Sequence, residues 1–458
     1  MAETANPCDV LCSLTDPKEL NRLCECTLVD VMDVRESLGV GGKGATRLDP
    51  TLHANLFSPY ALFVDRESLA LMEAVAQATF SVAQNPRYAD HVLGWAPEIA
   101  RHDPGSIGGV LGLDFHLTVA GPRLIEINTN PGGLLLNAVL LESVRSCAPS
   151  TWLPWTSGAQ AREASVTAWL EDARAQLGRM PTRMAIVDLA PHEQFLYPEF
   201  ELYAEAFRER GVDSVIRAPD ALRFGPNGLE DAQGQVDAVY NRLTDFSLAD
   251  QTLAPLHQAY LAGAIALTPH PRAHALFADK RNLAVLGDAS LLDSWGVDPL
   301  VANRLAQVIP STVEVTPENR DTLWADRRDC FFKPATGFGS RGSYRGDKLT
   351  RRVWDSMPST SYVAQAFAPP SVRIVHGGAS LKADVRCFAS ASGVLLYAAR
   401  LYQGQTTNMR TLHGGFAAVL TTPVLATSHH LLRPEECRNR DKHDSKGGTT
   451  AEPTDHIH

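Results

Sequence analysis

The sequence lacks the features that would assign it to several large classes of protein. Its longest apolar runs, Leu134–Leu136 and Ala138–Leu141, fall far short of the roughly 20 residues that a membrane-spanning helix needs. Basic residues form no extended cluster, and the 42 Lys and Arg are outnumbered by 52 Asp and Glu, which gives a formal net charge of −10. We therefore expect neither a membrane protein nor one that binds nucleic acid through bulk charge.

Cysteine is also scarce, because eight cysteines in 458 residues are too few for a disulfide framework. The N-terminal MAETANPCDV lacks the basic and then apolar order of a secretion signal. These two features predict a cytoplasmic protein with reduced cysteines. Four cysteines lie close together, and their C-x3-C and C-x-C spacing leaves a zinc site open beside ordinary packing roles; they are Cys8, Cys12, Cys24 and Cys26.

The rest of the composition is that of an ordinary globular protein, with 44% apolar and 21% charged residues. The spacing of apolar residues predicts helices over 67–85 and 159–178, and β-rich runs around a Gly-Pro turn predict a hairpin over 110–129. Gly178 followed by Pro181 predicts a domain boundary. At roughly 100–200 residues per domain, the length predicts two or three domains.

Strands and helices alternate after residue 183, which predicts a parallel sheet with crossover helices and an α/β fold. We expect strands at 183–190, 212–219 and 236–243, a helix at 200–211 and a loop at 225–235. The later pattern predicts a helix over 274–288, a strand leading into a Gly-rich loop, further strands at 362–367, 382–390 and 393–402, and a disordered polar tail from 434.

An oxygen-rich cluster is predicted within the hairpin. Asp114 lies on its first strand, and Glu126 and Asn128, two residues apart on the second, point to one face. Two carboxylates and an amide oxygen form an all-oxygen site of the kind that suits Mg²⁺. The alternative is a strand whose alternating polar residues face solvent. It fits less well, because the residues between the polar ones are strongly apolar.

A Gly-rich loop follows the strand that ends at Lys333, and it contains Gly337, Gly339, Ser340 and Gly342. Its backbone N–H groups can approach phosphate oxygens closely, while the lysine supplies positive charge. The loop is not a P-loop, because no Gly-Lys-Ser/Thr closes it, and it does not match the dinucleotide fingerprint. By itself it could be a plain turn, but together with the predicted metal cluster it favours nucleotide binding.

Several motifs together resemble those of ATP-grasp enzymes, closest in style to glutathione-synthetase-like members. The motifs are Lys333-Pro with the Gly-rich loop, Asp279-Lys280-Arg281, Asp384-x-Arg386, Asn408-x-Arg410 with Gly414-Gly415, and Asp114 with Glu126-x-Asn128. The resemblance implies that Lys280 and Lys333 bind nucleotide phosphates. It further implies that Asp114, Glu126 and Asn128 carry a pair of Mg²⁺ ions, with Mn²⁺ as a substitute, and that an arginine supports the acyl phosphate.

The order of these motifs departs from the ordinary family pattern, because the metal cluster precedes the Gly-rich loop. This order resembles the circularly permuted ATP-grasp group, with α+β grasp lobes and an α/β domain placed before the nucleotide-binding lobe. The implied organisation is an N-terminal segment at 1–40, a permuted part of the C-lobe with the metal ligands at 41–150, a linker helix at 151–182, a pre-ATP-grasp-like α/β domain at 183–270, a nucleotide-binding lobe at 271–365, the rest of the C-lobe at 366–433 and the tail at 434–458.

Two departures from the family pattern affect individual residues. Gln365 stands where the family usually brings an acidic residue near the adenine and ribose, and Gly112 replaces an arginine present in some ligases. The anion-stabilising role then goes to Arg400 or Arg410, with Arg386 as a further catalytic candidate.

The remaining candidates follow from strand positions and from the resemblance. Lys382 and Arg386 share a strand face with Asp384, which indicates nucleotide or anion binding or, alternatively, a solvent-facing strand with salt bridges. Arg242 ends a strand where α/β sheets bind ligands, so it either recognises a substrate carboxylate or has a structural role. Asn408, Gly414 and Gly415 are further substrate-binding candidates.

These features together predict an ATP-dependent carboxylate–amine ligase that forms an amide through an acyl phosphate and releases ADP and phosphate. Its expected partners are a small-molecule or peptide carboxylate and an amine, and a homodimer is left open. The alternatives are a kinase or a carboxylate–thiol ligase of the same fold, or a non-catalytic nucleotide-binding protein.

Overall fold

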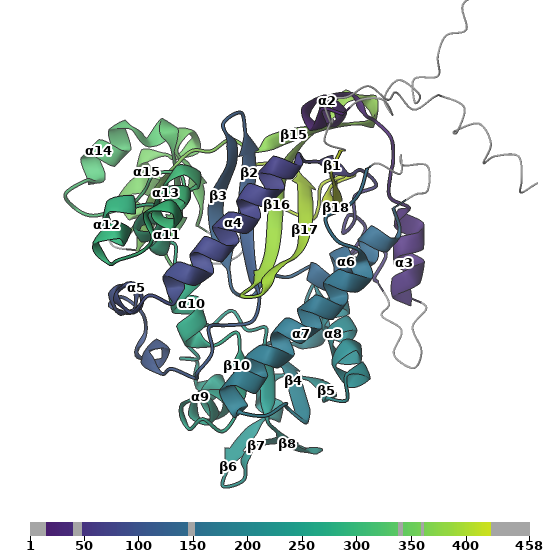
Figure 1. Cartoon of the computed structure of the whole chain (residues 1–458), viewed down its shortest axis with the longest axis vertical. Helices are drawn as coiled ribbons and strands as arrows, with labels where there is room; N and C mark the ends of the chain where they lie inside the picture. The colour runs from purple at the N-terminus through teal and green to yellow at the C-terminus, as the bar shows by residue number, and fades with distance from the viewer. Residues whose placement is uncertain (1–14, 40–47, 145–151, 338–341, 359–360, 423–458) are drawn as a thin grey trace, which may run out of the picture. The chain divides into compact units, whose positions relative to one another are not determined.

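The computed structural model describes residues 15–39, 48–144, 152–337, 342–358 and 361–422 (Figure 1). The described residues form four β-sheets with helices packed around them. In this part of the chain no helix is both long and apolar enough to cross a membrane. The predicted tail from 434 lies outside the described residues, as do Cys8, Cys12, Gly339 and Ser340.

The largest sheet has seven strands, which come from widely separated parts of the chain. Its order is β1-β18-β17-β16-β2-β3, with β15 paired to β16. The hairpin of β2 and β3 confirms the prediction for 110–129, and Gly121 at φ 94° provides its turn. The strands are β1 (Leu62–Phe63), β2 (Leu111–Thr118), β3 (Gly121–Asn128), β15 (Ser371–Val375), β16 (Ala379–Ser390), β17 (Gly393–Tyr402) and β18 (Gly415–Leu420).

Helices cover both faces of this sheet. The long helix α4 (Arg66–Ala83), predicted over 67–85, packs against β16 and β17 and lies across the sheet in Figure 1. On the opposite face, α6 (Leu134–Glu142) and α7 (Gly158–Leu177) pack against β17. The strands therefore place apolar side chains on both faces: Val385, Cys387, Ala399 and Leu401 belong to the α4 cluster, and Phe388, Leu396 and Ala398 to the other.

On the sheet face that packs against α6 and α7, β16 and β17 each carry a row of apolar side chains. Further along each strand, charged residues continue the row. Asp384 and Arg386 continue the row of Phe388, and Arg400 continues the row of Ala398. Asp384 is 1% exposed and Arg386 is 8% exposed. The alternative of a solvent-facing strand with salt bridges is therefore wrong for these residues.

The second sheet confirms the predicted parallel α/β unit, with the order β10-β9-β4-β5. Its strands are β4 (Arg183–Val187), β5 (Asp213–Arg217), β9 (Ala238–Asn241) and β10 (Ala266–Thr268), and α8 (Tyr197–Glu209) connects β4 to β5. The predicted loop at 225–235 is wrong in part, since a small antiparallel sheet forms there. Glycines with positive φ at Gly228 and Gly234 allow the tight turns between its strands, which are β6 (Arg223–Gly225), β7 (Gly228–Asp231) and β8 (Gly234–Val236).

The third sheet is antiparallel, with the order β11-β14-β12-β13. Its strands are β11 (Thr312–Glu314), β12 (Cys330–Pro334), β13 (Tyr344–Arg345) and β14 (Tyr362–Ala366). The helix predicted over 274–288 is wrong as a single element, because it divides into α10 (Pro271–Phe277) and α11 (Asn282–Leu286). Between them the backbone N–H of Lys280 donates to Ala335 O at 2.9 Å, which ties this break to the end of β12.

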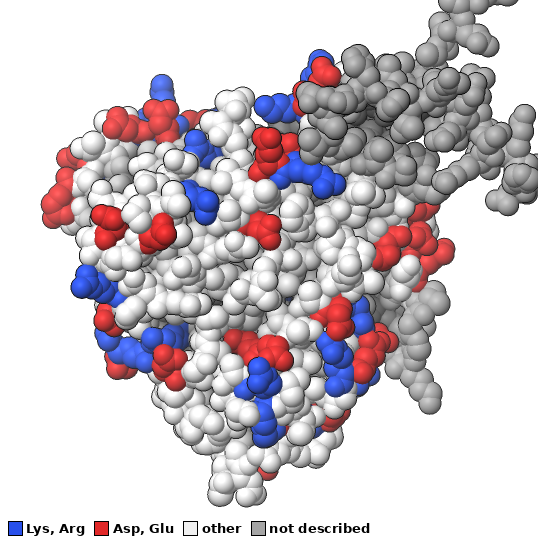
Figure 2. All heavy atoms as spheres, in the orientation of Figure 1, with Lys and Arg blue, Asp and Glu red and all other residues white. Residues whose placement is uncertain are grey.

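Further helices surround these sheets, and charged side chains of both signs lie on the surface of the molecule. On the face seen in Figure 2, acidic and basic side chains are interspersed. The helices are α2 (Pro17–Leu23), α3 (Val31–Gly39), α5 (Pro86–Val92), α9 (Ala254–Leu261), α12 (Ala289–Ser294), α13 (Pro299–Val308), α14 (Arg320–Ala325) and α15 (Arg351–Ser356).

Candidate functional site

The hairpin of β2 and β3 brings the three predicted metal ligands together. Asp114 lies directly opposite Glu126, and Gly112 lies opposite Asn128, in the antiparallel register. Asn128 Nδ2 donates to Asp114 Oδ2 at 3.3 Å. A register shift between Asp114 and Phe115, which strand periodicity does not predict, sets this pairing. All three side chains lie on the wall of one cavity.

Two arginines from neighbouring strands hold Asp114. Arg386 Nε donates to Oδ1 at 2.6 Å and Arg386 Nη2 to Oδ2 at 2.7 Å, while Arg400 Nη2 donates to Oδ2 at 2.9 Å. Burial raises the pKa of Asp114, but the two guanidiniums outweigh burial and lower it to about 2. Asp384 joins the network by accepting from Arg400 Nε at 2.7 Å and from Thr407 Oγ1 at 2.7 Å.

Arg386 occupies the space beside Gly112. A Cβ atom added at position 112 would lie 3.2 Å from Cδ and Nε of Arg386 and 2.6 Å from Cβ of Pro131. The glycine therefore makes room for an arginine that enters from β16 and not from β2.

Two lysines approach the same hairpin. Lys280 comes from the segment between α10 and α11, and Lys333 comes from β12. Lys280 Nζ donates to Gly337 O at 2.7 Å and lies 3.1 Å from Glu126 Oε1. Lys333 Nζ donates to Ile125 O at 2.7 Å and to Gln365 Oε1 at 2.8 Å. Burial lowers the pKa of Lys333 to about 8, against the raising effect of Glu126. Gln365 therefore orients Lys333, a role that the sequence did not predict.

These groups line a cavity of about 550 Å³ between the largest and the third sheet. Its charged wall contains the metal-ligand candidates, the lysines and Arg386 and Arg400. Its other walls are largely apolar or carry hydroxyl and amide groups, and include Phe331, Pro334, Phe367, Pro369, Pro370, Val372, Tyr402, Thr406, Thr407, Asn408 and Met409.

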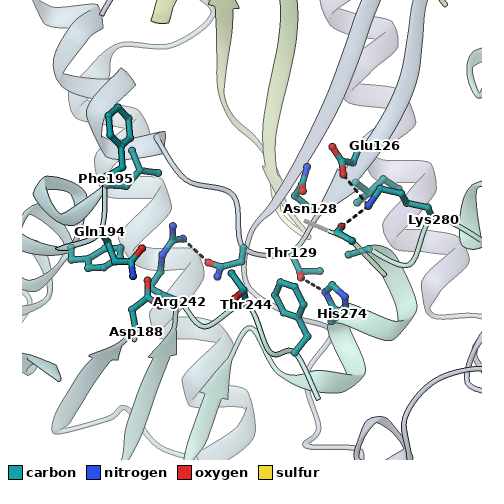
Figure 3. Close-up of a pocket in the computed structure, with 17 residues that line it drawn as sticks. Glu126, Asn128, Thr129, Asp188, Gln194, Phe195, Arg242, Thr244, His274 and Lys280 are labelled. Atoms are coloured by element: carbon teal, nitrogen blue, oxygen red, sulfur yellow. Dashed lines mark hydrogen bonds and ion pairs between the residues drawn. The ribbon is translucent and has the colours of Figure 1, made fainter. Parts of the chain in front are cut away.

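A second cavity of about 380 Å³ adjoins the first and shares Glu126, Asn128, Lys280 and Gly337 with it. In Figure 3, Asp188, Gln194 and Arg242 lie on one side of this cavity, and Glu126, Asn128 and Lys280 lie on the other. Its walls also include aromatic and apolar groups, namely Phe195, Leu196, Phe200, Phe246 and His274.

Arg242 is a buried cation in this second cavity; its hydrogen bonds go to neutral groups, while burial lowers its pKa and the carboxylates of Glu199 and Asp188 raise it through their charge. Its Nη1 donates to Asn130 Oδ1 at 2.5 Å and to Tyr240 Oη at 3.2 Å, and its Nε has no hydrogen-bond partner among the described residues. The Phe200 ring lies 5.3 Å from its Cζ. A guanidinium that lines a cavity is a candidate partner for a bound carboxylate.

Asp188 lies at the end of β4, the strand beside β9, which leads into Arg242. Burial raises the pKa of this carboxyl to about 6, although Leu189 N donates to it at 2.8 Å. Sequence reasoning missed Asp188. The signal was available, because the carboxyl ends of neighbouring parallel strands meet at one edge of a sheet.

Asp188→Asn is expected to stabilise the protein at pH 8 by about 1–3 kcal/mol, since each unit of pKa difference corresponds to ~1.4 kcal/mol. The folded-state pKa of about 6 lies above the ordinary aspartate value of 3.8, so ionisation of Asp188 costs folding free energy as pH rises through that interval. Urea unfolding at pH 8 and pH 4 measures the effect, which should fall to about 0.5 kcal/mol or less at pH 4.

Asp231 provides a matched control, for which the expected change in the free energy of unfolding has the opposite sign. Asp231 accepts hydrogen bonds from Arg183 and Arg217, and despite burial its pKa is lowered to about 2. Asp231→Asn should therefore destabilise the protein at pH 8. A gain from Asp188→Asn that is equal at pH 4 and pH 8 would contradict the assignment.

The structure separates the other predicted residues into two groups. Lys382, whose Nζ donates to Gly404 O, and Asn408 line the larger cavity with Gly337. Arg410 is exposed and lines neither cavity. Gly414 and Gly415 also lie outside both, because they pack against backbone: added Cβ atoms would lie 2.5 Å from Leu401 O and 2.3 Å from Asn55 O, respectively.

The candidate metal ligands fit a hard divalent cation. The candidate set consists of two carboxylates and an amide; within the described residues no group of three or more His, Cys, Asp and Glu side chains could hold a metal ion. Glu126 is 29% exposed and faces the junction of the cavities. Asp114 Oδ1 accepts from Arg386 Nε, which leaves a lone pair for an ion. Oxygen donors of this kind suit Mg²⁺.

Comparison with known proteins supports the fold. No protein-family model matches the chain, and no significant match exists among curated proteins. A glutathione synthetase-like effector from Globodera pallida, solved in its apo form, aligns with a TM-score of 0.52 over 89% of this chain and 98% of its own length, at 13% identity. This similarity shows a shared fold, consistent with the predicted ATP-grasp-like architecture.

A second solved structure is more distant. It is described as a candidate gamma-glutamylcysteine synthetase from Methylobacillus flagellatus, and it aligns with a TM-score of 0.43 over 76% of this chain and 87% of its own length, at 10% identity. A similarity of this size supports no argument about the present chain.

Proposed function

We propose that the protein is an ATP-dependent ligase that joins a carboxylate to an amine through an acyl phosphate and releases ADP and phosphate. The observation that carries the proposal is the meeting of two cavities at Glu126, Asn128 and Lys280. The larger cavity has lysines and apolar walls, and the smaller contains the buried cation Arg242. A phosphoryl donor in the first and a carboxylate in the second would meet at the shared residues.

The larger cavity suits ATP. Its apolar walls would enclose the base, and Lys333 and Lys280 would contact the phosphates beside the Gly-rich loop. Lys280 already bonds to Gly337 of that loop, so the lysine and the loop would act together. Mg²⁺ would be held by Asp114, Glu126 and Asn128, and it would neutralise charge on the transferred phosphoryl group.

The arginines suit the second half of the reaction. Attack by an amine on the acyl phosphate places negative charge on the carbonyl oxygen, and preorganised donors stabilise that charge. Arg386 and Arg400 are fixed by Asp114 and Asp384, so their positions cost no rearrangement during the reaction. We therefore assign this role to Arg386 and Arg400, and not to the exposed Arg410.

The sheet order supports a circularly permuted ATP-grasp arrangement as part of this proposal. The metal-ligand hairpin at 111–128 pairs directly with β16, which lies far later in the chain. The α/β unit from 183 and the sheet that carries Lys333 are inserted between these two segments. Motifs that are in an unusual order in the sequence are therefore adjacent in the fold.

The function is tested by measuring ADP release with ATP, Mg²⁺ and panels of amino acids, short peptides and polyamines, with mass spectrometry of the products. The expected result is one ADP per amide formed, only when a carboxylate and an amine are both present. A phosphorylated product without an amide would indicate a kinase, a thioester would indicate a thiol ligase, and binding without turnover would indicate a non-catalytic protein. Each of these outcomes would contradict the proposal.

Lys333→Met is expected to weaken ATP binding about tenfold or more, because a charge-assisted contact with phosphate is lost. Adenosine affinity should change little, since adenosine has no phosphate. Isothermal titration calorimetry with both ligands measures the difference. Lys348, exposed on the same lobe, gives the control variant Lys348→Met. Equal losses for ATP and adenosine would show that Lys333 acts only through the structure.

A further inference from the structure

His116 is a side chain of the larger cavity that the proposed reaction does not use. It lies on β2 two residues after Asp114, so the two side chains share a face of the largest sheet. That face forms the charged wall of the cavity, and His116 lines it. The neighbours Leu113 and Phe115 point to the other face and belong to the α4 cluster. The imidazole therefore stands beside the candidate metal and phosphate sites with no role assigned to it.

A hydrogen bond to a backbone carbonyl fixes the tautomer of His116. Its Nδ1 lies 2.6 Å from Ala368 O. Because a carbonyl oxygen only accepts, Nδ1 carries the proton, and Nε2 of the neutral ring then holds a lone pair. The side chain is partly exposed, and Nε2 has no hydrogen-bond partner among the described residues, yet it is not one of their buried, unpartnered atoms. Nε2 is therefore an acceptor that His116 presents to the cavity.

Gln365, which the family resemblance places near the adenine and ribose, does not offer such an acceptor. It is 2% exposed, its Oε1 accepts from Lys333 Nζ at 2.8 Å, and its Nε2 donates to Thr312 Oγ1 at 3.2 Å. Both ends of its side-chain amide are thus held by other side chains of the protein. His116 supplies the free side-chain acceptor that Gln365 does not.

The partner of His116 belongs to the apolar part of the cavity wall. Ala368 lies between Phe367 and Pro369, and all three residues line the cavity. Apolar walls suit the faces of a planar base, whereas ribose hydroxyls suit the hydroxyl and amide groups that residues 406–408 contribute elsewhere in the wall. An acceptor anchored at Ala368 is therefore placed to meet the edge of a base.

We propose that His116 selects adenine over bases with an oxygen at the same position, by accepting a hydrogen bond at Nε2 from the exocyclic amine of ATP. The inference rests on the proposed function in one respect, namely that ATP occupies the larger cavity. Hypoxanthine and guanine carry an oxygen in place of the amine. That oxygen would face the lone pair of Nε2, and neither acceptor would find a donor there.

The proposal is tested by calorimetric titration of the full-length protein with ATP and with ITP, which has an oxygen where ATP has the amine. The titrations contain Mg²⁺ and are run at pH 8, where an imidazole of ordinary pKa is neutral. We expect wild type to bind ATP at least about tenfold more tightly than ITP. Absence of ATP binding would overturn the proposed function together with this inference. Equal affinities for ATP and ITP would overturn this inference alone.

Two variants separate the roles of the two ring nitrogens. His116→Asn keeps an N–H donor near the position of Nδ1 and removes the acceptor at Nε2, so ATP should bind about fivefold or more weakly while ITP binding is not weakened. His116→Gln places a carbonyl oxygen near the position of Nε2 and should retain most of the preference for ATP. The control His376→Asn should change neither affinity, because His376 is 84% exposed in its side chain and lines neither cavity.

Deoxynucleotides distinguish the amine from the ribose as the donor to Nε2. Each of 2′-deoxyATP and 3′-deoxyATP lacks one hydroxyl and keeps the amine, so His116→Asn should weaken both as much as it weakens ATP. Equal losses for ATP and ITP in folded His116→Asn would show that the imidazole acts only through the structure. A loss that disappears with either deoxynucleotide would assign Nε2 to the ribose. Each of these two results would overturn the proposal, and the wild-type comparison of ATP with ITP tests it if the variants do not fold.

Discussion

Glu126→Ala is expected to lower turnover at least ~1,000-fold, because it removes a metal ligand and its charge from the point where phosphoryl transfer would occur. The fold should persist, since the side chain is 29% exposed and its described ion pair is with Lys280 alone. Turnover from ADP release, together with thermal unfolding by circular dichroism, measures both effects. Glu126→Gln should also be severely impaired, because it keeps the shape but loses the charge.

Asp355 provides a matched control for Glu126. It is 56% exposed and pairs with Arg351 on α15, away from both cavities. Asp355→Ala should keep turnover within about twofold of wild type, since exposed ion pairs contribute little. Near-normal turnover in folded Glu126→Ala would remove Glu126 from the reaction centre.

Asp114→Ala is expected to destabilise the protein by about 3–5 kcal/mol, because it leaves two buried guanidiniums without their shared carboxylate. Arg386 and Arg400 are only 10% and 13% exposed in their side chains. The folded-state pKa of about 2 lies below the ordinary aspartate value of 3.8, so the stabilisation is complete above about pH 5 and is lost as pH falls toward 2. Urea unfolding across this range measures it.

Asp355→Ala is also the control for Asp114→Ala, because it shows how much an arginine–carboxylate pair contributes when it is not buried. Asp355→Ala also removes a carboxylate from an arginine, but both partners are more than half exposed. Its effect on the free energy of unfolding should stay below ~1 kcal/mol at every pH. A comparable loss in Asp355→Ala and Asp114→Ala would show that the buried network does not stabilise the fold.

Local sequence rules predicted the hairpin and its cluster well. Strand periodicity places Glu126 and Asn128 on one face of β3. Their pairing with Asp114 depends in addition on a register shift between Asp114 and Phe115, which neither the turn at Gly121 nor the periodicity predicts. The parallel sheet from 183 followed in the same way from alternating strands and helices. Residues 225–235 were harder, because polar three- to four-residue strands with glycine turns have nearly the composition of a loop.

Long-range contacts explain what the sequence did not predict. The interruption of the helix at Lys280 depends on a hydrogen bond to Ala335, which no local pattern records. Burial of Asp384 and Arg386 depends on β2, which lies far away in the sequence and pairs with β16. Gln365 has the ordinary sequence signature of a strand residue, yet its contact with Lys333 is set by neighbouring strands.

The most direct test of the proposed ligase reaction follows oxygen from the substrate carboxylate. With that carboxylate labelled with ¹⁸O, and with ATP, Mg²⁺ and an amine, phosphorylation of the carboxylate followed by amine attack transfers one labelled oxygen to the released phosphate. We predict one ¹⁸O in each inorganic phosphate, with ADP and amide in equal amounts. Unlabelled phosphate during amide formation, or AMP and pyrophosphate as the products, would contradict the acyl-phosphate mechanism.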